Sequence, residues 1–266
     1  PREEDGSLAA EQPIRSTLYR RLAVLAAWVI GFAWLLARRD GVPHYAHFLR
    51  LDFGWLVAAG AAVFLAFFVQ TFLWEHRLFL GRDTGMAHAP RRLPPVDMLL
   101  LVVPLLYLPT AYDAQLGASA YRARSLDAAG ITLLQPLDEA RAAELEEDAA
   151  QGLAETDVQQ VTIEDLLTKP RNWLGRPVTL SGMVFHNQAT PLHGGILFRY
   201  QIACCAADAM PMGVLAVGDD SVNLPANGRW AEITGRLVPM QVDGKWHLGL
   251  RVDTARSIPK PAYPYL

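Results

Sequence analysis

Two long stretches without a charged side chain constrain this 266-residue chain more than any other feature. Residues 22–37 are sixteen uncharged positions, and residues 53–74 are twenty-two, of which only Gln70 and Thr71 are polar. A helix needs about 20 apolar residues to cross a hydrocarbon layer about 30 Å thick. Both stretches are therefore predicted to be transmembrane helices. A cleaved signal peptide is the competing interpretation of the first stretch, and the presence of the second argues against it.

A third apolar segment lies at residues 96–112. Asp97 stands near its start and Pro104 and Pro109 interrupt it, but residues 98–107 are entirely apolar. Proline kinks a membrane helix without excluding one. We expect a third span here, and an interfacial or re-entrant segment is the alternative for so short a run.

The distribution of arginine predicts the orientation. The N-terminal segment and the loop between the second and third stretches carry eight arginines together, whereas the loop between the first two carries three. Loops rich in basic residues stay on the cytoplasmic side of a membrane. With three spans, we expect a bacterial inner-membrane protein whose N-terminus is cytoplasmic and whose chain after residue 112 is periplasmic or otherwise extracytoplasmic.

The remainder reads as a water-soluble sequence. Residues 137–154 are rich in alanine, glutamate and leucine, which favour a helix, and four acidic residues gather at 144–148. We interpret the region 113–160 as a solvated, acidic helical linker, with an acidic face for a basic partner as the alternative. A short helix is expected to begin near Val161 and to end before Pro170.

After Pro170 the apolar pattern changes to a period of two, which is typical of strands. Five short strands are expected, and the Asp243-Gly244 pair predicts a hairpin between the last two. Gly182 and Gly235 lie inside strand patterns and would ease sharp coiling. A short helix and five strands in about a hundred residues suit a small barrel of the oligonucleotide-binding (OB) type. The expected strands are 176–185, 196–203, 213–217, 230–237 and 246–252.

The predicted fold class is thus a membrane α domain of three transmembrane helices plus a small all-β OB-like barrel with a short helix. The domains are a cytoplasmic tail (1–16), a transmembrane domain (17–112), the acidic helical linker (113–160) and an extracytoplasmic OB-like barrel (161–266). The net charge of −3 gives no basic field of the kind that attracts phosphate backbones, so nucleic acid is not an expected partner. Phe198, Arg199 and Tyr200 offer only a small stacking platform for single strands.

Cys204 and Cys205 are the most distinctive residues for chemistry. Outside the cytoplasm, these adjacent thiols could form a vicinal disulfide or share a soft metal ion with His186, His193 or Asp208. Neighbouring residues of a strand point to opposite faces, so we expect one cysteine to pack in the core unless the strand ends there. Structural packing or a structural disulfide is the favoured interpretation, and metal binding and redox chemistry are the alternatives.

The other candidate sites are weaker. His44 and His47 stand three residues apart, which places two imidazoles on one helical face, and we interpret them as a solvated pair at the membrane interface. Ser181, His186 and Asp208 could supply a nucleophile, a base and an acid, but no nucleophile elbow or known hydrolase spacing surrounds them. We therefore expect neither an enzyme nor a catalytic residue, and no cofactor apart from zinc in the alternative.

Three motifs carry a resemblance to a known family. Residues 196–209 read Ile-Leu-Phe-Arg-Tyr-Gln-Ile-Ala-Cys-Cys-Ala-Ala-Asp-Ala, residues 175–182 read Gly-Arg-Pro-Val-Thr-Leu-Ser-Gly, and residues 259–266 are rich in proline and tyrosine. Over residues 161–266 this pattern resembles the YcgQ-like family of bacterial membrane proteins. The resemblance implies an N-terminal membrane anchor, an extracytoplasmic C-terminal domain and pairing with a multi-span permease, sometimes in zinc-responsive settings. It implies no enzymatic activity. The chain departs from the family in lacking a histidine-rich cytoplasmic loop, because His76 and His88 are the only histidines between the second and third apolar segments.

The resulting functional hypothesis is a non-enzymatic accessory subunit that docks on a larger membrane complex through its helices and its barrel. Gly60 and its neighbouring alanines suit close helix packing. Expected partners are the lipid bilayer and other membrane subunits, from a transporter, respiratory or photosynthetic complex. The alternative is a zinc-handling or other metal-handling partner of a permease that uses the Cys-Cys motif. A carbohydrate- or lipid-binding module with Trp230 or Trp246 in an outward groove is a third option.

Overall fold

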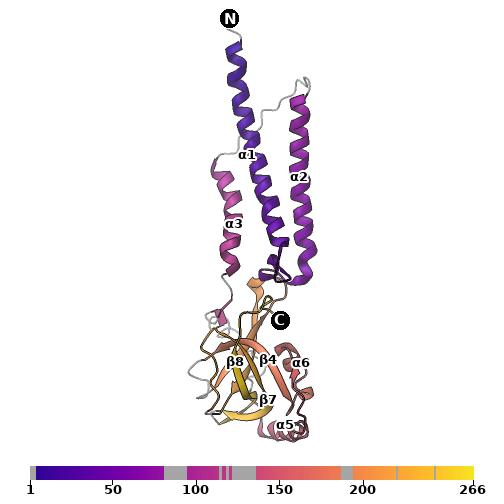
Figure 1. Cartoon of the computed structure of the whole chain (residues 1–266), viewed down its shortest axis with the longest axis vertical. Helices are drawn as coiled ribbons and strands as arrows, with labels where there is room; N and C mark the ends of the chain where they lie inside the picture. Colours follow the sequence, from indigo (N-terminus) through magenta and orange to yellow (C-terminus); the bar gives the residue numbers. More distant parts are fainter. Residues whose placement is uncertain are drawn as a thin grey trace. The chain divides into compact units, whose positions relative to one another are not determined.

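The computed structural model of the chain describes residues 4–80, 95–113, 116–117, 120–121, 136–186, 194–219, 221–242 and 244–266. Within these ranges, only the backbone is described at 4–18, 74–80, 95–100 and 111–113. The chain divides into two units, Pro1–Gln115 and Leu116–Leu266. The first contains three long helices and the second a coiled sheet with short helices (Figure 1).

The helical unit consists of α1 (Glu4–Leu36), α2 (Gly54–Leu80) and α3 (Pro95–Asp113), and α1 contacts both other helices (Figure 1). Two helical stretches, Tyr19–Leu36 and Leu51–Leu73, are long and apolar enough to cross a membrane. In α3 the backbone stays helical through Pro104 and Pro109, but its described apolar run, Leu101–Thr110, is shorter than a full span. The three-helix count therefore stays a prediction. Because α1 begins at Glu4, most of the predicted tail 1–16 continues the first helix.

Glycine brings the three helices close together. A Cβ atom at Gly60 of α2 would lie 2.8 Å from the Phe32 ring of α1, and one at Gly31 of α1 would lie 2.6 Å from a methyl carbon of Leu105 in α3. Trp28 of α1 stacks on Phe64 of α2 with 5.0 Å between ring centroids. The glycine that suggested helix docking thus serves a contact within this unit.

The connection between α1 and α2 is folded. Two short strands, β1 (Arg38–Arg39) and β2 (Val42–Pro43), pair before the 3-10 helices η1 (His44–His47) and η2 (Leu51–Phe53). His44 lies in η1, where its Nδ1 is 2.9 Å from the carbonyl oxygen of Trp34 and its ring packs on the Trp34 ring. The predicted histidine pair is therefore built into a structured turn.

The sheet unit contains β3 (Gln159–Gln160), β4 (Pro177–Phe185), β5 (Gly194–Gln201), β6 (Met210–Val217), β7 (Trp230–Val242) and β8 (Lys245–Ser257). The strand order is β3-β4-β5-β6-β8-β7, and β7 also pairs with β4, so five strands pair in a closed ring. The β3–β4 and β6–β8 pairs are parallel and the others are antiparallel. All five expected strands are present.

Glycines allow the sheet to coil. The β7–β8 pairing shifts register between Thr234 and Gly235, and a Cβ at Gly235 would lie 2.2 Å from the Arg251 carbonyl oxygen. A Cβ at Gly182 would lie 2.8 Å from the Phe198 carbonyl oxygen. The predicted hairpin joins β7 to β8 with Val242 opposite Lys245, and Gly244 has a φ of +75°, a conformation that glycine adopts without steric cost.

Two side-chain clusters fill the sheet unit. The larger one has a fully buried aliphatic centre, and the smaller one is aromatic, with Tyr121 between Phe185 and Phe198. Close packing of such side chains is the main source of stability in a domain of this size. The aliphatic centre includes Val178, Leu180, Leu197, Ile233, Leu237 and Leu250.

Helix α5 (Glu139–Gly152) differs from the predicted solvated linker. Ala142, Leu145 and Ala149 recur at helical spacing and are buried, and Leu145 and Ala149 belong to the aliphatic cluster. Glycine at position 152 lets the helix end approach the backbone of Leu174, whose oxygen lies 2.1 Å from the position of a Cβ there. This helix is thus part of the folded sheet unit, while its acidic residues face away from the core. The predicted short helix is α6 (Ile163–Thr168), with Thr162 as its N-cap.

Candidate functional site

The vicinal cysteines lie in a turn that follows β5. This strand ends at Gln201, and the chain then bends through Cys204 and Cys205 into the 3-10 helix η4 (Ala206–Asp208). Cys204 is exposed, Cys205 is half-buried, and both are free thiols. The strand ends before the cysteines, which is the case that the expectation of a core-packed cysteine excepted, and neither cysteine packs in the core. The alternation of faces stops where the strand ends.

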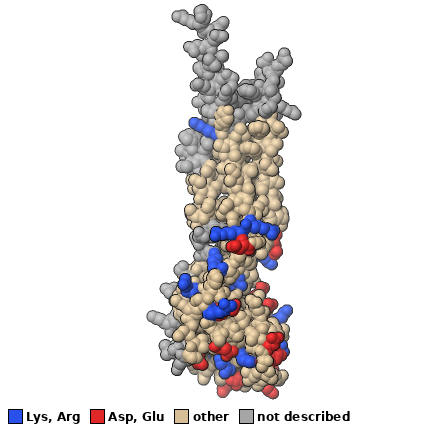
Figure 2. Space-filling model, viewed as in Figure 1, with Lys and Arg blue, Asp and Glu red and all other residues tan. Residues whose placement is uncertain are grey.

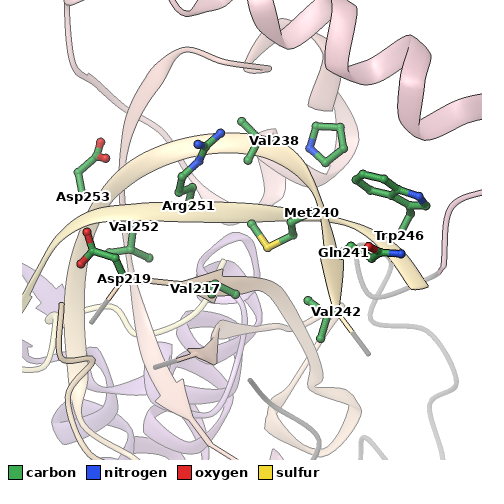
Figure 3. Close-up of a pocket in the computed structure, with 12 residues that line it drawn as sticks. Val217, Asp219, Val238, Met240, Gln241, Val242, Trp246, Arg251, Val252 and Asp253 are labelled. Atoms are coloured by element: carbon green, nitrogen blue, oxygen red, sulfur yellow. The ribbon is translucent and has the colours of Figure 1, made fainter. Parts of the chain in front are cut away.

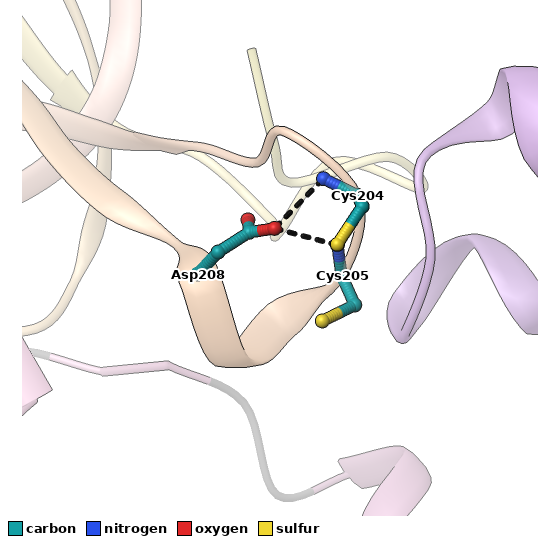
Figure 4. A group of neighbouring side chains, drawn as sticks. All are labelled: Cys204, Cys205 and Asp208. Atoms are coloured by element: carbon teal, nitrogen blue, oxygen red, sulfur yellow. Dashed lines mark hydrogen bonds between the residues drawn. The ribbon is translucent and has the colours of Figure 1, made fainter.

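Asp208 holds the turn in place (Figure 4). Its Oδ2 accepts hydrogen bonds from the backbone N–H groups of Cys204 and Cys205 at 2.8 and 3.2 Å, and its Oδ1 accepts one from Ala203 at 2.9 Å. The Cys205 sulfur in turn accepts the Asp208 N–H, which completes a reciprocal capping box. The sequence gave no clear signal of this brace, because cysteine is not among the residues that usually cap a helix.

The same contacts determine the protonation states of Asp208 and Cys204. A hydrogen bond from the Cys204 thiol, assisted by those from the backbone, lowers the pKa of Asp208 to about 2. The hydrogen bond to the carboxylate, with a second contact to Cys205, raises the pKa of Cys204 to about 12. At neutral pH Cys204 is therefore a thiol, and the attacking species in cysteine chemistry is the thiolate. This environment disfavours a nucleophilic or redox-active cysteine.

Three metal donors meet in this turn. One ligand atom each from Cys204, Cys205 and Asp208 lies within 4.8 Å of the other two. Of the predicted ligand set, these three residues are brought together. His193 lies outside the described residues.

His186 lies elsewhere. Its Nδ1 is 2.9 Å from the Gly194 carbonyl oxygen and its Nε2 is 2.9 Å from that of Pro225, so both ring nitrogens have backbone partners. His186 contacts Gly194, the first residue of β5, and the cysteines follow the last residue of this strand. The eight residues of β5, about 26 Å at 3.3 Å per residue, therefore separate His186 from the cysteines. His186 is thus not a ligand beside the cysteines. The same separation keeps His186 from Asp208, so no triad with Ser181 is assembled.

A groove lies beside the β7–β8 hairpin (Figure 3). Its volume is about 790 Å³, with Met240, Val242 and Trp246 on the apolar part and Asp219, Arg251 and Asp253 at the charged part. Trp246 is half-buried there, whereas Trp230 is buried in the aromatic cluster. A groove lined by one tryptophan gives the carbohydrate- or lipid-binding option little support. The groove depends on where the pairing of β6 with β8 ends, and the alternation of residues within β7 and β8 does not report this.

The contacts of Arg199 are the second feature that the sequence did not reveal. Its Nη2 donates to the Tyr263 carbonyl oxygen at 2.7 Å and its Nε to that of Pro264 at 3.3 Å, and the guanidinium lies 5.6 Å from the Trp230 ring centroid. Burial lowers the pKa of this side chain. Its strand neighbours Phe198 and Tyr200 are fully buried, so these aromatic rings form no exposed stacking platform.

Comparison with known proteins bears on this unit. A DUF1980 C-terminal domain is found at residues 140–266, slightly less than half of the chain. The match begins in α5 and includes the cysteine turn, the groove and the segment held by Arg199. It fits the YcgQ-like resemblance noted in the sequence. A comparison with curated proteins finds no match.

Proposed function

We propose that this protein is a non-enzymatic accessory subunit, anchored in a bacterial inner membrane, that docks on a larger membrane protein complex. The observation that carries the proposal is that one chain combines helices with exposed apolar side chains and a sheet unit with a filled core. Its helices turn apolar side chains outward, with Trp55 66% and Leu106 67% exposed, whereas the sheet unit is filled by its own side chains. Because side chains fill the interior of the sheet unit, we expect it to bind partners through its surface.

The arginine distribution and the apolar helices support the rest of the topology. In this proposal α3 is the third span, with its two prolines accommodated in a helical backbone, and the sheet unit is extracytoplasmic. Figure 2 shows that the described helical surface on this face is largely uncharged, while charged residues are spread over the sheet unit. Lipid and a partner's helices are the neighbours that suit such a helical surface.

The closed pairing supports the OB type of barrel. The ring follows the order β4-β5-β6-β8-β7 and closes by the pairing of β7 with β4. If β4 is strand 1 of the barrel, this order is 1-2-3-5-4-1, with a parallel contact between strands 3 and 5. Small barrels of this type bind partners through strand faces and loops. The groove beside Trp246 is therefore the barrel surface that we assign to docking on another membrane subunit.

Purification from native membranes in a mild detergent tests docking. We expect the chain to migrate on a native gel in a complex larger than itself, and Val242→Arg in the groove to release it. Val158→Arg is the matched control, because Val158 is an exposed valine of the same unit outside the groove lining. A single 29.3 kDa species from wild-type membranes would contradict the proposal.

Protease added to right-side-out and to inverted vesicles tests the orientation separately. The sheet unit should be digested in the first preparation and protected in the second. The opposite pattern would overturn the extracytoplasmic assignment without affecting the gel result.

Metal handling on behalf of a permease is the second candidate function. The specific observation in its favour is the meeting of three donor atoms at Cys204, Cys205 and Asp208. Elemental analysis of the full chain, purified with reductant and without chelator, should find a bound transition metal that Cys204→Ser removes. A metal content equal to that of the variant would count against this candidate.

A further inference from the structure

The turn after β5 presents two sulfur donors from adjacent residues to one point. Within a strand such neighbours face opposite ways. Here the bend into η4 leaves the ligand atoms of Cys204, Cys205 and Asp208 within 4.8 Å of one another (Figure 4). Because Cys204 is exposed, an ion can reach this point from solvent.

The carboxylate in this cluster is already committed. Asp208 Oδ2 accepts two backbone hydrogen bonds, Oδ1 accepts one, and the Cys204 thiol donates another, which together use the roughly four acceptor positions on a carboxylate. Using Asp208 as a full ligand would compete with the hydrogen bonds that shape the turn. It is better suited to hold the two sulfurs in place than to bind the ion.

No further histidine, cysteine, aspartate or glutamate joins Cys204, Cys205 and Asp208 among the residues that the structure describes. The cluster there contains no imidazole, and the nitrogens of His186 contact carbonyl oxygens at the far end of β5. Zinc in proteins takes at least three protein ligands and usually four. Thiolates select soft cations, Cu(I) among them. A site of two sulfurs thus fits a soft ion that accepts a low coordination number.

We propose that Cys204 and Cys205 together bind one Cu(I) ion as a two-sulfur site, with Asp208 as the positioning residue. This inference rests on the second candidate function and names its cargo. On binding, both thiols lose their protons to solvent, two Cu–S bonds form, and the oxidation state of copper and sulfur is unchanged. Asp208 keeps its hydrogen bonds to the backbone of the turn and loses the one that the Cys204 thiol donated.

The test uses the full chain in detergent, without oxygen and with ascorbate, titrated with the Cu(I)–bicinchoninate complex and separately with Zn²⁺ against a zinc dye. We expect one Cu(I) per chain, weaker binding of Zn²⁺, and loss of Cu(I) binding in Cys204→Ser and in Cys205→Ser. Asp208→Asn should weaken Cu(I) binding roughly tenfold, as loss of an outer-shell hydrogen bond does, with the stoichiometry kept. Thermal unfolding of each variant shows whether the fold survives.

Three results would overturn the inference, and they differ in reach. Tighter binding of Zn²⁺ than of Cu(I), abolished in folded Asp208→Asn, would show a zinc site with a carboxylate ligand and leave the metal-handling function standing. Unchanged Cu(I) binding in both serine variants would place the copper elsewhere. Binding of neither ion by folded wild-type protein would remove the inference and the metal-handling function together.

Discussion

In the helical unit Trp55 and Leu106 turn about two thirds of their surface outward, whereas in the sheet unit Leu180 and Leu250 expose none. Both units are built from the same apolar residue types. The difference indicates two solvents: the sheet unit excludes water by packing on itself, and the helices keep apolar faces that hydrocarbon or a partner's helices would cover. The type of an apolar residue therefore does not predict its energetic role, which depends on the unit that contains it.

The largest effect expected from this contrast is on leucine truncation. Leu180→Ala removes a fully buried side chain from the aliphatic cluster and should destabilise the sheet unit by about 2–5 kcal/mol. Leu65→Ala, at a half-exposed position in α2, should change the stability of its unit by less than about 0.5 kcal/mol. Denaturant unfolding in detergent, followed by circular dichroism, measures both. Equal effects would break the comparison.

Glycine substitution should give the next largest effect and the same contrast. Gly235→Ala places a Cβ 2.2 Å from a backbone oxygen that the β7–β8 pairing holds, and should cost about 1–3 kcal/mol. Gly60→Ala meets only the Phe32 ring, which can move, and alanine favours the helix by about 1 kcal/mol. Its net effect should be near zero in thermal unfolding. A larger loss at Gly60 than at Gly235 would mean that the α1–α2 contact is as rigid as the sheet.

Acid should act on the sheet unit through the braced turn. The pKa of Asp208 is about 2 in the folded chain, below its ordinary value, so its contribution to stability is present above about pH 4 and is lost as the pH falls towards 2. Residues 22–37 and 53–73 hold no charged group that could titrate in this way. The difference in melting temperature between wild type and Asp208→Asn should therefore shrink from pH 6 to pH 2.5. A constant difference would show that the carboxylate charge does not stabilise the turn.

Surface ion pairs should have the smallest effect. Arg256 and Glu232 are 2.6 Å apart across β8 and β7, and Arg50 and Asp52 are 3.0 Å apart before α2. Each pair has at least one side chain that is more than half exposed, so it should contribute about 0–1 kcal/mol, and salt screens it. Arg256→Gln and Arg50→Gln should both lie near wild type in thermal unfolding at high salt. A clear loss in either would mark a constraint that exposure does not reveal.

Periodicity predicted much of this architecture because it records local solvation. The uncharged runs gave α1 and α2, and alternation gave all five strands of the ring. Alternation could not decide whether a cysteine packs in the core, because it does not show where β5 ends. The linker prediction failed for a related reason: acidic residues dominate α5 by number, while Leu145 and Ala149 decide where it packs.

The candidate site was less predictable than the fold. Proximity in sequence grouped Cys204, Cys205 and Asp208, but the bracing role of Asp208 had no clear signal, because cysteine is not among the residues that usually cap a helix. His186 could not be placed without the strand order, because eighteen positions in sequence become the length of β5 in space. Arg199 contacts residues more than sixty positions away, and no pattern in the sequence around it predicts these contacts.

Those contacts have a consequence for biosynthesis. Tyr265 fills part of the aromatic cluster, and the carbonyl oxygens of Tyr263 and Pro264 are the acceptors of the Arg199 guanidinium. A nascent chain that has emerged only as far as β8 lacks these acceptors. We therefore expect the sheet unit to complete its packing only after the segment around Tyr263–Tyr265 has left the ribosome.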